Sequence, residues 1–129
     1  MDLHAYVLRM ENERRQKRSN DPLIALHLQY AHLRREAGLE ALVLTDSTGM
    51  VVAGAGPWAV CEELAAYAPI LSREDDGPSS ERIESLREQV RVRSLFVPGG
   101  EVLLCSRGEQ GDDSLLSRAE VGTQRILAA

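Results

Sequence analysis

The stretch that decides the fold is Leu39–Thr45 (LEALVLT), followed by Asp46–Gly49 (DSTG) and then by Met50–Ala53 (MVVA). The two outer runs are aliphatic, as strands are, and the four residues between them have the chemistry of a tight turn. A parallel pair of strands needs a crossover of about a dozen residues or more, and this turn is far too short for one. The sequence therefore predicts an antiparallel hairpin, with a strand over 39–45 paired to a strand over 50–55.

A helix is predicted immediately before this hairpin. Ser19-Asn20-Asp21-Pro22 supplies capping residues and then proline, the pattern that opens a helix. An apolar stripe follows at spacings of three and four, namely Leu23, Leu26, Tyr30, Leu33 and Ala37. Gly38 stands where a left-handed cap would end the helix, so we expect it to span 22–37.

A second hairpin is predicted farther along the chain. The aliphatic stretches 90–97 and 101–106 flank Pro98-Gly99-Gly100, in which the glycines accept the positive φ angles of a turn. Helices are predicted over 57–68, over 81–88 and from 113 to 128, the last of them capped by Asp112 or Asp113. We expect Pro69 to end or kink the helix over 57–68, because proline lacks the backbone donor and clashes with the preceding turn.

The remaining segments complete one domain, residues 1–129. Residues 2–18 fit an additional N-terminal helix, with Leu3, Tyr6, Val7 and Met10 at helical spacing, and residues 72–80 are polar and loop-like. The predicted fold class is α/β (α+β), a central antiparallel sheet of four or five strands flanked by helices. Helices 22–37 and 113–128 are expected to share one face of the sheet, with helix 57–68 on the other face or at a dimer interface.

The glycine pair Gly54 and Gly56 matches G-x-G-x-x-A, a variant of the dinucleotide-binding fingerprint. That motif requires a second strand parallel to the first after the glycine loop and helix. Here the strand before the glycines is the returning arm of a hairpin, and the residues after the helix are acidic and loop-like. The pair is therefore interpreted as a connection, and no cofactor is expected.

Composition restricts the functional classes. The net charge of −5 disfavours general binding of nucleic acid, which usually requires an excess of basic residues. No apolar run approaches the ~20 residues that cross a bilayer, and residues 1–20 lack the apolar core of a secretory signal. Cys61 and Cys105 lie in apolar stretches, which indicates buried thiols and a cytoplasmic location.

No group of residues indicates catalysis or metal binding. His27 and His32 are five residues apart and cannot chelate as an i, i+4 pair on a helix would, so they are interpreted, like His4, as surface residues. Glu62 and Glu63 open a helix, where the helix dipole stabilises negative charge. Cys61 and Cys105 lack the spacing of a zinc site. We therefore expect no catalytic residue, no metal and no enzymatic activity.

Two features have both a structural and a functional interpretation. Trp58, the single tryptophan, either covers the core or anchors a partner, because tryptophan is enriched where proteins bury surface against one another. The basic run Arg14–Arg18 is either a solvated helix end or a contact for an acidic partner.

The sequence Ala37–Ala53 resembles the opening hairpin of the roadblock family, named after dynein light chains and common in bacterial small-GTPase systems. In that hairpin a glycine and an aliphatic strand precede an Asp-containing turn, a glycine and a second strand. Leu64–Ala68 (LAAYA) resembles the family's central alanine-rich helix. The similarity covers about 22–71 by residues and the rest by element order.

This resemblance implies a roadblock/profilin-like sandwich and a non-enzymatic regulator or scaffold that binds a Ras-like small GTPase or another roadblock-like subunit. It also implies a homodimer formed through the central helix and an adjacent strand. The expected partner or dimer interface contains Trp58, Glu62, Ala65, Ala66 and Tyr67, although the alanines could instead pack on the sheet. The chain departs from the family in having two strands, not three, after the central helix. A GAF-like small-molecule sensor is the alternative.

Overall fold

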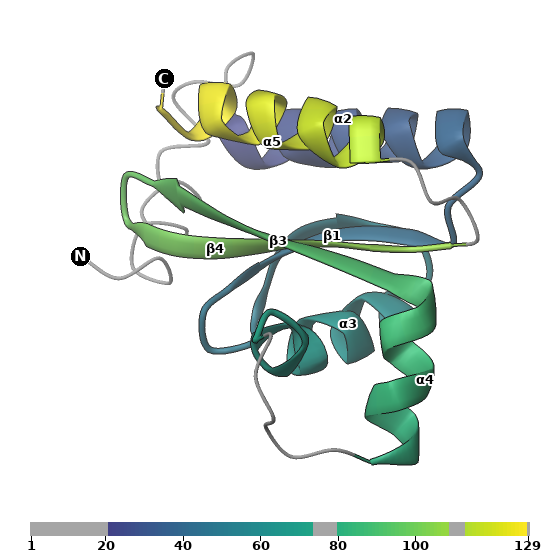
Figure 1. Cartoon of the computed structure of the whole chain (residues 1–129). Helices are drawn as coiled ribbons and strands as arrows, with labels where there is room; N and C mark the ends of the chain where they lie inside the picture. Colours follow the sequence, from purple (N-terminus) through teal and green to yellow (C-terminus); the bar gives the residue numbers. More distant parts are fainter. Residues whose placement is uncertain (1–20, 74–79, 109–112, 129) are drawn as a thin grey trace.

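A computed structural model describes residues 21–73, 80–108 and 113–128 of the 129-residue chain (Figure 1). Four helices and four strands follow one another in these residues, in the order α2 (Pro22–Ala37), β1 (Ala41–Asp46), β2 (Val51–Ala55), α3 (Trp58–Leu71), α4 (Glu81–Gln89), β3 (Val90–Val97), β4 (Gly100–Arg107) and α5 (Asp113–Ala128). The predicted helix over 2–18 and a cap at Asp112 lie outside the described residues, as does most of the predicted loop over 72–80.

Helix α2 has the bounds that its caps predict. The side chain of Asp21 accepts a hydrogen bond of 2.9 Å from the backbone N–H of Leu23. At the other end, Gly38 adopts φ 66°, and the N–H of Leu39 donates to the carbonyl of Arg34 at 3.0 Å. Because this last turn of α2 uses Leu39, strand β1 begins at Ala41, two residues later than the apolar pattern alone predicts.

The sheet is antiparallel throughout, with the strand order β2-β1-β4-β3. Both predicted hairpins are confirmed, as is the predicted sheet of four or five strands. The hairpin of β1 and β2 joins the hairpin of β3 and β4 through the pairing of β1 with β4. This pairing runs from Ala41 opposite Arg107 to Asp46 opposite Val102. The two edge strands are therefore β2 and β3.

The turn between β1 and β2 is organised by Asp46. Its Oδ1 accepts hydrogen bonds from the backbone N–H and hydroxyl of Thr48 and from the N–H of Met50, at 2.6–3.0 Å. Gly49 follows at φ 95°, a conformation that residues with a Cβ rarely adopt. This is the Asp-containing turn followed by glycine that the sequence predicts.

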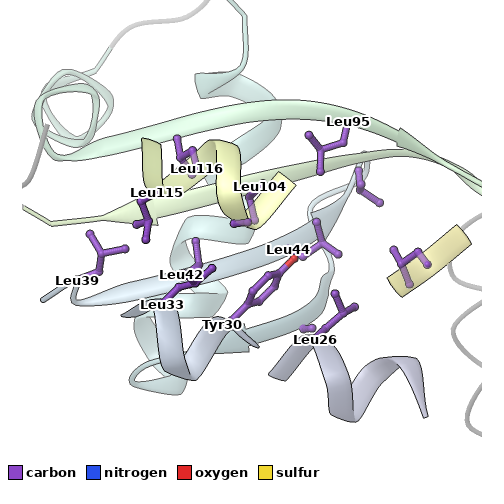
Figure 2. Close-up of a cluster of buried hydrophobic side chains, with 14 residues drawn as sticks. Leu26, Tyr30, Leu33, Leu39, Leu42, Leu44, Leu95, Leu104, Leu115 and Leu116 are labelled. Atoms are coloured by element: carbon purple, nitrogen blue, oxygen red, sulfur yellow. The ribbon is translucent and has the colours of Figure 1, made fainter. Parts of the chain in front are cut away.

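Helices cover both faces of the sheet, and each face has its own apolar cluster. Helices α2 and α5 lie side by side on one face, and α3 lies on the other (Figure 1). The larger cluster, between the sheet and the layer of α2 and α5, surrounds Tyr30 and contains leucines from both helices and from the sheet (Figure 2). The smaller one joins α3 to the opposite face of β1 and β4 through residues such as Val43, Leu64 and Leu103. The predicted distribution of the three helices over the two faces is confirmed.

Pro69 does not end helix α3, contrary to one of the two sequence expectations. The helix continues to Leu71, and the N–H of Ser72 still donates to the carbonyl of Ala68 at 2.9 Å. Because proline has no N–H, Pro69 cannot donate to the carbonyl of Ala65, and the helix lacks that one hydrogen bond. The last turn is held in place by the buried Ala68. Gly49, in the turn between β1 and β2, lies next to the carbonyl of Ala65. A Cβ added to Gly49 would lie 3.1 Å from that carbonyl oxygen.

Candidate partner-binding surface

Helix α3 has a buried face and an exposed face. Its buried residues are Cys61, Leu64, Ala65 and Ala68. All of them except Ala65 belong to the smaller apolar cluster between α3 and the sheet. The exposed face carries Trp58, Glu62 and Ala66, which are four residues apart and therefore lie along one line of the helix. The candidate surface consists of this line of three residues with the half-buried Tyr67 beside it.

Trp58 does not cover the core. Its side chain is 61% exposed at the first residue of α3. The preceding Gly56 turns the chain from β2 into α3 with φ 122°, and a Cβ there would lie 2.6 Å from the carbonyl oxygen of Glu40. Only glycine fits such a close approach to the start of β1, so Gly56 places the tryptophan at the end of the sheet.

Of the glycine pair, Gly56 lies in the connection between β2 and α3, as the sequence predicts, whereas Gly54 does not. Gly54 lies within β2, and an added Cβ would stand 3.1 Å from Val43 Cγ2 and 3.3 Å from Cys61 Sγ. Its missing side chain thus leaves room for α3 to pack on β2. The strand is the second arm of an antiparallel hairpin, which is the wrong geometry for a dinucleotide fingerprint.

The alanines of α3 separate into two environments. Ala65 is buried within its own chain, whereas the neighbouring Ala66 is exposed. A contact between two copies of α3 would therefore be made by Ala66 and Tyr67 more than by Ala65. This division follows from how α3 is rotated against the sheet, which the sequence alone does not determine.

Glu63 forms an ion-pair cluster that no pattern in the sequence predicts. Its carboxylate accepts from Arg82 of α4, and from Arg107 of β4 at 3.2 Å. The guanidinium of Arg107 is only 16% exposed and also lies 3.2 Å from the carboxylate of Glu40. The partners of Glu63 are 19 and 44 residues away in sequence, so no local pattern could identify them. The cluster ties α3, α4 and the end of β4 together and leaves Glu62 as the exposed acid of the candidate surface.

The histidines of α2 are exposed, as predicted, and each has a structural contact. The Nδ1 of His27 lies 2.9 Å from the carbonyl oxygen of Gly54. The Nε2 of His32 lies 3.3 Å from the carboxylate of Glu36, one turn along the same helix. Within the described ranges, no three His, Cys, Asp or Glu side chains gather as a metal site would require.

Both cysteines are free and buried, which confirms the prediction of buried thiols. Burial raises the pKa of Cys105 to about 12. Burial also raises the pKa of Cys61, against the opposing effect of the nearby Arg34 charge. A thiol with a raised pKa is a poor nucleophile near neutral pH, because the reactive species is the thiolate.

Comparisons with known proteins give one similar structure. No protein-family model matches the chain, and no curated protein matches it. Among solved structures, the chain is similar to Myxococcus xanthus MglB, with 12% sequence identity and a TM-score of 0.48 over 82% of this chain and 86% of that chain. In the part of the chain that the structure describes, no helix has the length and apolarity needed to cross a membrane.

Proposed function

We propose that this protein is a non-enzymatic regulator or scaffold that acts as a cytoplasmic homodimer and binds a Ras-like small GTPase or another roadblock-like subunit. The proposal rests on the resemblance of Ala37–Ala53 and Leu64–Ala68 to the roadblock family. The observation that carries it is the exposure of Trp58 at the start of α3, in line with Glu62 and Ala66.

An exposed tryptophan at a helix end favours binding of a protein partner. A large aromatic side chain has about 200 Å² of surface to bury, so covering the exposed part of Trp58 would contribute roughly 3 kcal/mol. Glu62 lies one turn away and would pair with a basic patch on the partner, which favours fast and specific association. Ala66 is small and would let a second helix approach closely.

The placement of the reactive side chains supports a non-enzymatic role. The thiols of Cys61 and Cys105 are buried, and the imidazoles of His27 and His32 contact a backbone carbonyl and a surface carboxylate. A catalytic site would group a nucleophile with a base and an orienting residue. Native mass spectrometry of the purified protein should accordingly show no retained small molecule, whereas a GAF-like sensor would retain one.

The test is affinity capture from the native cell with three baits: the wild type, Trp58→Ala and the control Phe96→Ala. Phe96 is also an exposed aromatic residue, 74% accessible, but it lies on β3 and not on α3. The wild type and Phe96→Ala should enrich a Ras-like GTPase or a roadblock-like protein, and Trp58→Ala should lose it. If none of the baits enriches a protein of either class, the proposed function is wrong.

A further inference from the structure

A groove is lined by residues of α2 and α5. These two helices lie side by side on the face of the sheet opposite α3 (Figure 1). The volume of the groove is about 440 Å³. Leu33 of α2 and Gly122 of α5 are buried at its base, and Val121 stands on its rim with 62% of its side chain exposed. Leu28, which is 67% exposed, lies one turn before the groove residue His32 on α2. Two exposed apolar side chains, Leu28 and Val121, therefore stand beside the groove, one on each helix.

Gly122 makes room for the side chain of Gln29 at the base of the groove. The side chain of Gln29 crosses from α2 to the backbone of Gly122, and an added Cβ there would lie 1.7 Å from Gln29 Nε2. The Oε1 of Gln29 is buried and accepts no hydrogen bond from any part of the chain that the structure describes. A helix interior usually disfavours glycine, so the residue is explained by the close approach that it permits.

Two arginines, Arg118 and Arg125, line this groove, and none of its described lining residues is acidic. Among the described residues of α2 and α5, the exposed charged side chains are three arginines and one glutamate, namely Arg35, Arg118, Arg125 and Glu36. Arg118 forms two hydrogen bonds with Glu36, at 2.9 and 3.1 Å, so these two charges neutralise each other and Arg125 is the other charged side chain of the lining. The positive surface contrasts with the net charge of −5 of the whole chain.

We propose that the groove between α2 and α5 binds an amphipathic helix of a partner protein, with an apolar stripe flanked by Asp and Glu residues. The apolar stripe would cover Leu28 and Val121 and enter the groove, which is the manner in which amphipathic helices bind grooves elsewhere. An acidic flank would meet Arg125, and charge pairs of this kind select the partner more than they add affinity. This binding site is separate from the α3 surface and does not depend on the proposed function.

Charge argues against the chain's own N-terminal segment as the occupant. Residues 1–20 contain five basic residues, Arg9, Arg14, Arg15, Lys17 and Arg18, and three acidic ones, Asp2, Glu11 and Glu13. A segment with a net positive charge is disfavoured beside a basic groove. The same reasoning favours an acidic helix from another protein.

The test uses two labelled helical peptides of 18 residues with the same leucine stripe, one flanked by glutamates and the other by lysines. Fluorescence anisotropy with the full chain should give at least tenfold tighter binding of the glutamate peptide. This preference should shrink as the salt concentration rises from 50 to 500 mM, because salt screens exposed charges. Backbone NMR shifts should change on α2 and α5.

Two variants locate the binding. Val121→Glu, on the rim of the groove, should weaken binding of the glutamate peptide at least tenfold, whereas the control Phe96→Glu, on β3, should leave it unchanged. Equal binding of the two peptides, no binding up to millimolar concentration, or shifts confined to α3 and α4 would each overturn the proposal. Self-association of the wild type that Val121→Glu abolishes would also overturn it, because the occupant would then be a second copy of the chain.

Discussion

The hydroxyl groups of Tyr30 and Thr123 share a buried hydrogen bond between α2 and α5 (Figure 2 shows Tyr30 within the apolar cluster). Both residues are fully buried, and they lie 93 residues apart in sequence. The bond restricts how the two helices can rotate against each other, because one hydroxyl donates to the other at a place where Tyr30 is surrounded by apolar side chains. The groove on the outer side of the two helices depends on this alignment.

The first prediction is that Tyr30 and Thr123 are strongly coupled. Tyr30→Phe leaves the hydroxyl of Thr123 buried without its partner, and Thr123→Val does the same to Tyr30, so each should cost about 1–3 kcal/mol of unfolding free energy. The double variant should cost clearly less than the sum, because it removes both polar groups together. Urea unfolding of the four proteins measures the cycle, and additive losses would show that the bond contributes no coupling.

The second prediction concerns alkaline pH. Burial raises the pKa of Tyr30 well above its usual value, and burial raises the pKa of Cys105 to about 12. In the unfolded chain a thiol loses its proton near pH 8.5 and a phenol near about 10. Above these values the unfolded state binds fewer protons than the folded state, so stability falls as pH rises, by about 1.4 kcal/mol per pH unit for each group.

Urea unfolding at pH 8 to 11 measures this dependence. Cys105→Ala should flatten the fall above pH 8.5, and Tyr30→Phe should flatten it above pH 10, whatever each variant costs in absolute stability. The matched control for the thiol is the wild type at pH 6 to 8, where neither group titrates and the slope should be small. Slopes that are the same in the wild type and both variants would contradict the assignment.

The third prediction concerns the free edge of β2. The backbone carbonyl and N–H of Gly54 both face the Nδ1 of His27, at 2.9 and 3.4 Å, so the imidazole covers this part of the edge. An uncovered strand edge invites pairing with another chain. His27→Ala should speed hydrogen exchange at the amide of Gly54 and lower stability by about 0.5–1.5 kcal/mol. His32→Ala, on the same helix, is the control and should leave this amide unchanged.

Short-range signals allowed much of this fold to be predicted from the sequence. Asp21 and Gly38 define α2 through bonds to residues two to five positions away, and both hairpins depend on turns of a few residues. Such interactions can be identified from a window of sequence, because the residues that make them are neighbours. The same windows predict which helices are amphipathic and therefore which of them can cover a sheet.

Long-range relationships could not be predicted in this way. The pairing of β1 with β4, the cluster around Glu63 and the crossing of Gln29 over Gly122 all join residues that are far apart in sequence. The sequence left two interpretations of Trp58 open, and its exposure at the start of α3 excludes the one in which it covers the core. The burial of Ala65 could not be known, because it depends on how α3 is rotated against the sheet.

The fourth prediction is that Gly122→Ala leaves the protein folded and at least as stable. The new methyl group would displace the end of Gln29, which is a flexible side chain that can rotate toward the groove. Alanine stabilises a helix interior by about 0.5–1 kcal/mol relative to glycine, which offsets the displacement. Thermal unfolding should show an unchanged or higher midpoint. A loss of more than about 1 kcal/mol would mean that Gln29 cannot move and that the base of the groove is rigid.

The last prediction is that the protein forms a homodimer through the exposed face of α3. Two copies related by a twofold axis would bring Ala66 against the partner helix, with Tyr67 beside it and Glu62 one turn away. Ala66→Glu should dissociate the dimer, because the new carboxylate is bulky and would be close to like charges at the contact. Gln124→Glu adds the same charge on the exposed side of α5 and should leave the dimer intact.

Multi-angle light scattering measures the mass at high micromolar concentration. A wild-type protein that is strictly monomeric there would count against the dimer, and a dimer that survives Ala66→Glu would place the interface elsewhere, with the free edge of β3 as the next surface to test.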